Sequence, residues 1–263
     1  MKYLLLILIM ISFIFKGYTQ DPAAIESRVY HWEEIGIDTS RPGAMNPVFE
    51  GVSDGFEYLN IFLATVGKGA SFKLPINNDS LESLIIMKTG QVNQHVGHKN
   101  RVMGPGSVTL VMPGEKPRID NNGDNPANFY VILWRVKDFY NGHIPESNQS
   151  IPSHLINWQE LTYEKTAKGG YRHVIRQPTS MLTEFEMHVT TLEEGKRSHP
   201  PHTHLDEEII LVRFGEVEES IDGKLYDADE GSLIFLRSMV PHGIRNIGKG
   251  SCEYYAFRWI PKK

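Results

Sequence analysis

Apolar residues in this chain occur in short runs separated by glycine, proline and asparagine, and few segments repeat with helical spacing. Residues 209–212, 232–236 and 253–259 are rich in β-branched and aromatic side chains, which is typical of strands. Asp222-Gly223 is a hairpin signal, and residues 121–124 carry a similar turn signal. Many short strands at this spacing predict an all-β chain built as a sandwich or a barrel.

The pattern occurs twice along the chain, with a constant offset of 125 or 126 residues. The matched pairs are Trp32 with Trp158, Gly69 with Gly195, Gly90 with Gly215, Gly106 with Gly231 and Trp134 with Trp259. Such self-similarity indicates two copies of one structural unit. We therefore expect two tandem antiparallel β-barrels from an internal duplication, one over residues 21–145 and one over residues 146–263. Residues 141–153 have the composition of a linker.

Residues 1–20 resemble a secretory signal peptide, because Lys2 precedes an apolar run over residues 3–15 that ends at Lys16. This run is shorter than the roughly 20 residues that a membrane-spanning helix needs, so an uncleaved anchor is the less favoured alternative. We expect cleavage near residues 19–21 and an exported protein, periplasmic or secreted, with no membrane contact after cleavage. Cys252 is the only cysteine, so no intrachain disulfide can form.

Composition narrows the classes of partner. The net charge is −5 at pH 7 and no cluster of lysine and arginine occurs, so nucleic acid is not an expected partner. The hydrophobic fraction of 40% is ordinary for a chain that buries a core. A small-molecule substrate is the partner that we expect.

A group of chemically active residues lies between Gly195 and Gly215. His202 and His204 are two positions apart, so on an extended strand their imidazoles face the same side. Glu208 begins the apolar run that follows, and His242 can return from a neighbouring strand. Imidazoles and a carboxylate that face one space suit a divalent transition metal.

These residues resemble the motifs of the cupin superfamily, specifically the two-domain bicupins. Gly195, His202, His204, Glu208 and Gly215 fit the first cupin motif, with one extra residue before His202. Gly231, His242 and Asn246 fit the second motif, although Arg237 and Met239 replace its usual proline and inner glycine. The resemblance implies jelly-roll barrels and one divalent metal, either Mn, Fe, Zn, Ni or Cu, bound by His202, His204, Glu208 and His242. Bicupins often assemble further, which leaves a homodimer open.

The N-terminal half lacks the ligands. The offset places Asn77, Asp79, Ser83 and Pro117 where the C-terminal half has its three histidines and its glutamate. Tight binding of a transition metal is not expected without imidazoles. We expect a structural partner, and a metal-free pocket for a small ligand stays an alternative. His95 and His98 belong to a predicted hairpin over residues 91–101 and are expected to face solvent.

Strand alternation predicts the walls of the site. Ile210, Val212 and Phe214 share the face of Glu208 and should line the pocket, whereas Arg213 should point away and Glu207 should be a surface charge. His199 is expected at the rim. Two residues are candidates for catalysis. His188 shares a strand face with Glu186, which looks either into the barrel or into solvent. Arg258 is either a clamp for a substrate carboxylate or a surface residue.

Three functions fit this pattern. The first is an enzyme of isomerase or lyase type, with Lewis-acid chemistry on a sugar acid or another carboxylate, in carbohydrate breakdown. The second is a metal-dependent dioxygenase similar to the bicupin quercetinases. The third is a non-catalytic module that binds a sugar or a metal. Bicupin ureidoglycine aminohydrolases share the layout but rank lower, because their metal motif lacks the His-x-His arrangement.

Overall fold

A computed structural model describes residues 23–35, 43–74, 79–137 and 151–261. The expected signal peptide over residues 1–20 and most of the expected linker lie outside this part of the chain. No helix within the described residues is long and apolar enough to cross a membrane. Within the described residues the helical elements are α1 (Trp32–Ile35) and the 3-10 helix η1 (Trp158–Glu160), and the other regular elements are strands joined by turns and loops.

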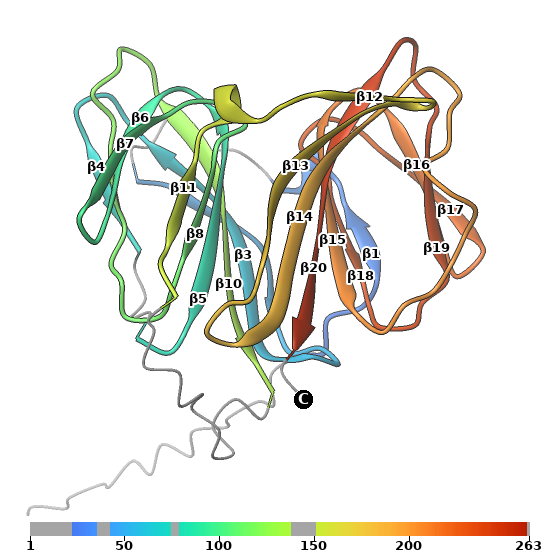
Figure 1. The fold of residues 1–263 in the computed structure, drawn as a ribbon, viewed down its shortest axis with the longest axis horizontal. Helices are drawn as coiled ribbons and strands as arrows, with labels where there is room; N and C mark the ends of the chain where they lie inside the picture. The colour runs from blue at the N-terminus through green and yellow to red at the C-terminus, as the bar shows by residue number, and fades with distance from the viewer. Residues whose placement is uncertain (1–22, 36–42, 75–78, 138–150, 262–263) are drawn as a thin grey trace, which may run out of the picture.

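Two β-barrels stand side by side, as the sequence predicts (Figure 1). In the first, a six-stranded sheet faces a four-stranded one. The larger sheet contains, in spatial order, β11 (His154–Ile156), β8 (Val108–Val111), β5 (Glu82–Thr89), β10 (Ala127–Val136), β3 (Phe56–Val66) and β2 (Met45–Gly51). The smaller contains β4 (Ser71–Lys73), β9 (Arg118–Asp120), β6 (Val92–Val96) and β7 (Lys99–Met103). β6 and β7 form the predicted hairpin.

The second barrel repeats this arrangement with a seven-stranded and a three-stranded sheet. The larger contains β1 (Arg28–Tyr30), β18 (Leu233–Leu236), β15 (Glu207–Phe214), β20 (Cys252–Pro261), β14 (Leu182–Leu192), β13 (Gly169–Gln177) and β12 (Glu164–Thr166). The smaller contains β17 (Lys224–Ala228), β16 (Val217–Ile221) and β19 (His242–Asn246). The all-β prediction of two jelly-roll barrels is confirmed.

The two barrels exchange strands. β1 precedes the first barrel in the chain but pairs with β18 of the second, with Val29 opposite Ile234. β11 precedes the second barrel but pairs with β8 of the first, with Leu155 opposite Thr109. The exchange is visible where β1 joins the C-terminal strands and β11 joins the N-terminal ones (Figure 1). Each larger sheet is therefore completed by the segment that leads into the other half.

Strand alternation sends one face of each larger sheet into its own barrel and the other face toward the neighbouring barrel. Ile209 and Leu211 of β15 belong to a core cluster shared by both halves, whereas Ile210 and Val212 belong to the interior of the second barrel. Stacked and edge-on aromatic rings dominate the shared cluster. Its ring pairs include Trp134 with Phe185, Trp134 with Trp259 and Phe56 with Trp259.

The prediction that Glu207 is a surface charge is wrong, because its side chain is buried. Its carboxylate accepts hydrogen bonds from the Ser53 hydroxyl at 2.8 Å and from the backbone N–H groups of Asp54 and Gly55. Burial raises the pKa of Glu207, and these hydrogen bonds oppose the rise. The odd face of β15 meets the other barrel and not solvent, so the residue beside the metal motif joins the two halves.

Candidate metal centre

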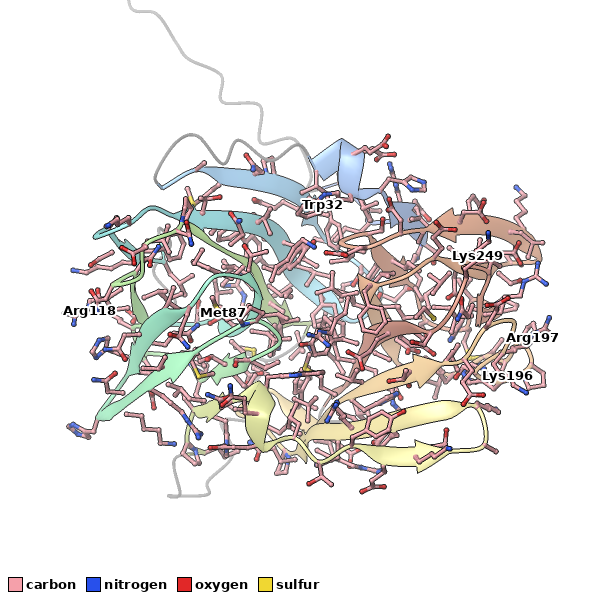
Figure 2. All side chains as sticks on the ribbon, turned by 90° about the horizontal axis from the view of Figure 1, so that it is seen from above. Trp32, Met87, Arg118, Lys196, Arg197 and Lys249 are labelled. Atoms are coloured by element: carbon pink, nitrogen blue, oxygen red, sulfur yellow. The ribbon has the colours of Figure 1, made fainter. Side chains whose placement is uncertain are left out.

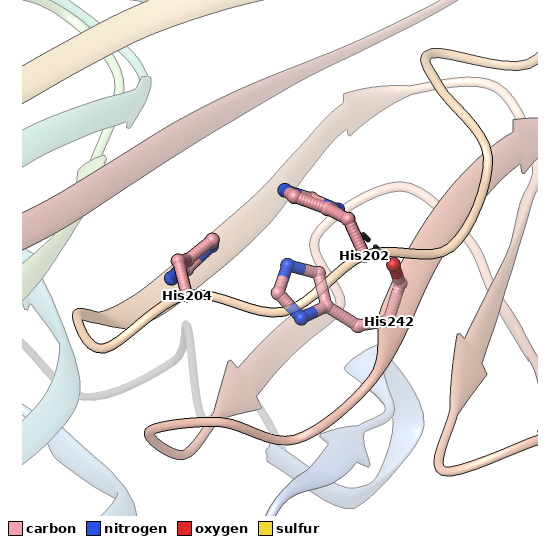
Figure 3. A group of neighbouring side chains, drawn as sticks. All are labelled: His202, His204 and His242. Atoms are coloured by element: carbon pink, nitrogen blue, oxygen red, sulfur yellow. Dashed lines mark hydrogen bonds between the residues drawn. The ribbon is translucent and has the colours of Figure 1, made fainter.

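The imidazoles of His202, His204 and His242 converge at one end of the second barrel, and their ligand nitrogens lie within 4.8 Å of one another (Figure 3). His202 and His204 lie in the segment that leads into β15, and His242 begins β19. A bridge of two backbone hydrogen bonds, each 3.0 Å, joins His202 to His242. This bridge brings together residues that are 40 positions apart in the sequence.

Backbone carbonyls orient two of the rings. The Nδ1 atom of His204 lies 2.8 Å from the Asp206 carbonyl oxygen, and that of His242 lies 2.8 Å from the Val240 carbonyl oxygen. A ring that donates its Nδ1–H to a carbonyl keeps the Nε2 lone pair for a metal. The Nε2 atom of His242 is buried and makes no hydrogen bond to any described residue.

Glu208, near the start of β15, completes the group. Its Oε2 atom lies 3.0 Å from His204 Nε2 and 3.4 Å from His242 Nε2. Burial alone would raise the pKa of Glu208, but the two imidazoles outweigh burial and lower it to about 2. Ligands roughly 2.0–2.2 Å from a metal lie about 3 Å apart when they meet at a right angle, so these spacings fit one metal ion.

A cavity of about 190 Å³ opens beside this group. Ile210 lines it as predicted, and His199 lies at the rim with its ring 4.0 Å from that of His202. Phe214 does not line the cavity; the register of β15 shifts after Val212, and the Phe214 side chain is 38% exposed. The prediction for Phe214 was wrong because a bulge interrupts the alternation on which it rested.

Substitutions at matched interior positions explain why this barrel is hollow. Offsets of 125 or 126 pair Phe62 with His188, Phe72 with Ser198, Phe129 with Tyr254 and Leu133 with Arg258. In the first barrel these four residues, Phe62, Phe72, Phe129 and Leu133, all belong to the buried interior cluster. Met87 belongs to the same cluster and lies among the strands of that barrel (Figure 2). In the second barrel, all four matched residues line the cavity.

His188 and Arg258 both line the cavity, so the inward alternative is the one found for each. Arg258 is not free to clamp a carboxylate, since its Nε and Nη2 atoms each lie 2.6 Å from Glu186 Oε2. Its Nη1 atom lies 3.4 Å from a carboxylate oxygen of Asp206. The His188 ring stacks on Tyr171 at 5.1 Å and lies 3.4 Å from Glu186. His188, followed by Arg258, lowers the pKa of Glu186 to about 2.

Residues 188–258 match the family model described as "Cupin domain". This part of the chain, which lies in the second barrel, is a cupin domain. No curated protein matches the sequence.

Solved structures extend the cupin likeness to both barrels. A putative glyoxylate-induced protein from Pseudomonas aeruginosa superposes with a TM-score of 0.67 at 13% identity, covering 83% of this chain and 81% of that one. The oxalate decarboxylase of Lactobacillus farciminis, in a formate complex, gives 0.66 at 11% identity, covering 92% and 88%. AerE from Microcystis aeruginosa gives 0.58 at 13%, covering 77% and 88%. At these identities the likeness shows the fold.

Glu219 is a residue of the cupin site that the sequence analysis missed. It lies on β16 between Val217 and Ile221, on the face that alternation buries, and its side chain lines the cavity. Burial, then the charge of Glu208, raise its pKa well above the ordinary value. The sequence did contain a signal for it: Glu219 lies between Val217 and Ile221 in an alternating pattern, which predicts that its side chain points into the barrel.

The departures from the second cupin motif are accommodated. Met239 adopts a positive φ of 62°, the conformation that the usual glycine takes without strain, and its N–H donates to the His204 carbonyl at 2.8 Å. Arg237 donates hydrogen bonds to the carboxylates of Asp54 and Glu26, which belong to the other half of the chain. The turn thus holds the backbone of one candidate ligand and ties the cupin barrel to its neighbour.

Proposed function

We propose that this protein is a metal-dependent cupin whose C-terminal barrel binds one divalent transition metal through His202, His204, Glu208 and His242. The observation that carries the proposal is the convergence of three imidazoles and one carboxylate at the wall of a cavity. Nitrogen and oxygen ligands of this kind accept Mn, Fe, Zn, Ni or Cu, because affinity depends on metal availability as much as on geometry.

We further propose an enzyme of isomerase or lyase type that acts on a small oxygenated substrate, such as a sugar acid or another carboxylate. Three neutral imidazoles and one carboxylate leave a divalent ion with a net positive charge, and such an ion polarises carbonyl and carboxylate oxygens. The chain supplies the other parts of the site. Ile210, Ile244 and Ala256 form an apolar wall that limits water, and His188, 3.4 Å from Glu186, places an imidazole at the cavity.

Two observations support a carboxylate as the substrate. The fold is shared with oxalate decarboxylase, which by its name acts on a small dicarboxylate and was solved with formate. The cavity of about 190 Å³ suits a molecule of a few carbon atoms. The apolar run over residues 3–15 supports export, and sugar acids released by carbohydrate breakdown outside the cytoplasm fit that setting.

Removal of single ligands tests the metal site. We expect one metal ion per chain in the purified protein by elemental analysis. In His202→Ala and His242→Ala we expect the metal content to fall by about tenfold or more. Loss of a ligand should weaken metal affinity by more than the roughly 10–100-fold that is typical when a supporting residue is lost. His98→Ala, on the exposed hairpin of the other barrel, is the control. Full metal content in both ligand variants would overturn the assignment.

Turnover by the metal-loaded and the chelated protein, measured on uronates, keto acids and small carboxylates, tests the reaction class. Metal-dependent turnover without oxygen uptake supports the proposal. Oxygen consumption with iron or copper would indicate a dioxygenase. Thermal stabilisation by these compounds without turnover would indicate a binding module.

A further inference from the structure

Glu219 lies at the inner wall of the cavity, and none of the described side chains is a hydrogen-bond partner of its carboxyl group. Its side chain is fully buried, and among the described residues no side chain hydrogen-bonds to either carboxyl oxygen; the backbone N–H of Gly243 is the one hydrogen-bond donor that opposes the rise of its pKa. A buried carboxyl group whose oxygens lack hydrogen-bond donors destabilises the folded state. Such a cost is ordinarily tolerated where a ligand supplies the missing partner.

The matched position in the first barrel shows what a structural residue looks like here. Gln94 occupies it and is also buried, but its Oε1 atom accepts a 2.6 Å hydrogen bond from the Thr109 hydroxyl. Its Nε2 atom lies 3.3 Å from the sulfur of Met87. In the second barrel the residues that correspond to Thr109 and Met87 are Ile234 and Val212. Both are apolar, so the partners are lost while an acidic group is kept.

The surroundings of Glu219 also differ between the two halves. Gln94 is packed against a filled interior, whereas Glu219 faces the cavity that also exposes His204 and Glu208. A small molecule held at the histidine cluster therefore occupies the same cavity that Glu219 lines. Ile244, opposite Glu219 on β19, offers no polar side-chain atom.

We propose that Glu219 contacts the bound small molecule directly and selects hydroxy acids over the same acids without the hydroxyl group. This rests on the proposed function, because the acid end of the ligand is taken to be held at the metal centre. A hydroxyl group both donates and accepts, so it pairs with a carboxyl group in either protonation state. An apolar ligand atom at the same place leaves the buried carboxyl without a partner.

Calorimetric titration of the metal-loaded protein with pairs of acids that differ by one hydroxyl group tests this inference. The probes are malate against succinate, lactate against propionate, and glycolate against acetate. We expect at least one pair in which the wild-type protein binds the hydroxy acid about tenfold or more tightly. Glu219→Met, which keeps the length of the side chain, should abolish that preference, and Glu219→Gln, which can still donate and accept, should retain it.

Gln94→Met is the matched control, because it removes the buried polar group at the equivalent position of the other barrel. It should leave the hydroxyl preference unchanged. Glu219→Leu, which matches the apolar neighbours, serves if the methionine variant does not fold. Wild-type protein that binds metal but shows no hydroxyl preference in any pair, or a preference that survives Glu219→Met or Glu219→Leu, overturns the inference. Absence of metal from the wild-type protein, measured beforehand, is instead failure of the proposed function.

Discussion

At the scale of single residues, the site depends on which ring nitrogen each histidine leaves free. His204 and His242 point Nδ1 at backbone carbonyls two residues away, so the chain itself sets their tautomers. The spacing of His202 and His204 predicted a shared face, but it could not predict these carbonyl contacts. They depend on the turns around residues 204–206 and 240–242, which no periodic pattern specifies.

The affinity of the site for metal should fall as the pH is lowered. The hydrogen bond to Glu208 raises the pKa of His204 against the opposing effect of burial. Below that raised pKa the ring holds a proton that a metal must displace, and above it the lone pair is free. Metal affinity should therefore decrease by roughly tenfold per pH unit below the pKa of His204. Competition with a chromophoric chelator, from about pH 5 to about pH 8, measures this, and a flat profile would contradict it.

At the scale of elements, alternation along a strand was the most reliable guide. It placed Glu208, Ile210 and Val212 on one face of β15 and sent Arg213 to the other, where the guanidinium lies over the Trp158 ring at 3.8 Å. Alternation failed at Phe214, where a bulge intervenes. It could not say that the outer face of the strand meets a second barrel, so Glu207 was misassigned. The residues that contact Glu207 on that face, residues 53–55, are more than 150 positions away in the sequence.

The strand exchange could not be predicted from the sequence for the same reason. β1 and β11 are three residues each, too short to show a period. Their partners lie in the other half of the chain, and nothing in either segment specifies them. The two exchanged segments are nevertheless related by the same offset as the barrels, so the internal duplication found in the sequence includes them.

One tryptophan follows each exchanged strand and packs on a glycine of the other half: Trp32 on Gly231 and Trp158 on Gly106. Trp32, at the junction of the barrels in Figure 2, covers Gly231, where an added Cβ would lie 2.5 Å from the ring and where φ is +90°. Gly231→Ala should destabilise the protein by about 2–4 kcal/mol, from backbone strain and overpacking together. Gly223→Ala has a similar φ of +77° but open space around it, and should cost only the strain, about 1–2 kcal/mol.

Urea unfolding of the two variants separates strain from steric conflict. Gly106→Ala, whose Cβ would lie 2.7 Å from Trp158, should resemble Gly231→Ala because it repeats that packing in the other half. Equal costs for Gly231→Ala and Gly223→Ala would show that the tryptophan does not hold the exchanged segment in place.

At the scale of the whole molecule, the two barrels share one core cluster but differ in their interiors. The first barrel has a filled interior, and the second a cavity with candidate ligands. Matched carboxylates join them: Glu207 accepts hydrogen bonds from residues 53–55, and Glu82 accepts them from the Thr179 hydroxyl and the Met181 N–H. The filled barrel therefore supports the barrel with the candidate metal site through contacts on the outer face of the strand that carries Glu208.

This arrangement predicts a single unfolding transition. Glu207→Ala and Glu82→Ala should each lower the stability of the whole molecule by about 1–3 kcal/mol, because buried donors lose their acceptor. That corresponds to roughly 2–4 °C in Tm per kcal/mol. Differential scanning calorimetry of the metal-free protein measures the transition, and tryptophan fluorescence follows Trp134 and Trp259 at the shared core. Glu193→Ala, at an exposed position, is the control. Two separate transitions, or a shift in which only one half melts earlier, would show that the barrels are independent and that Glu82 and Glu207 do not couple them.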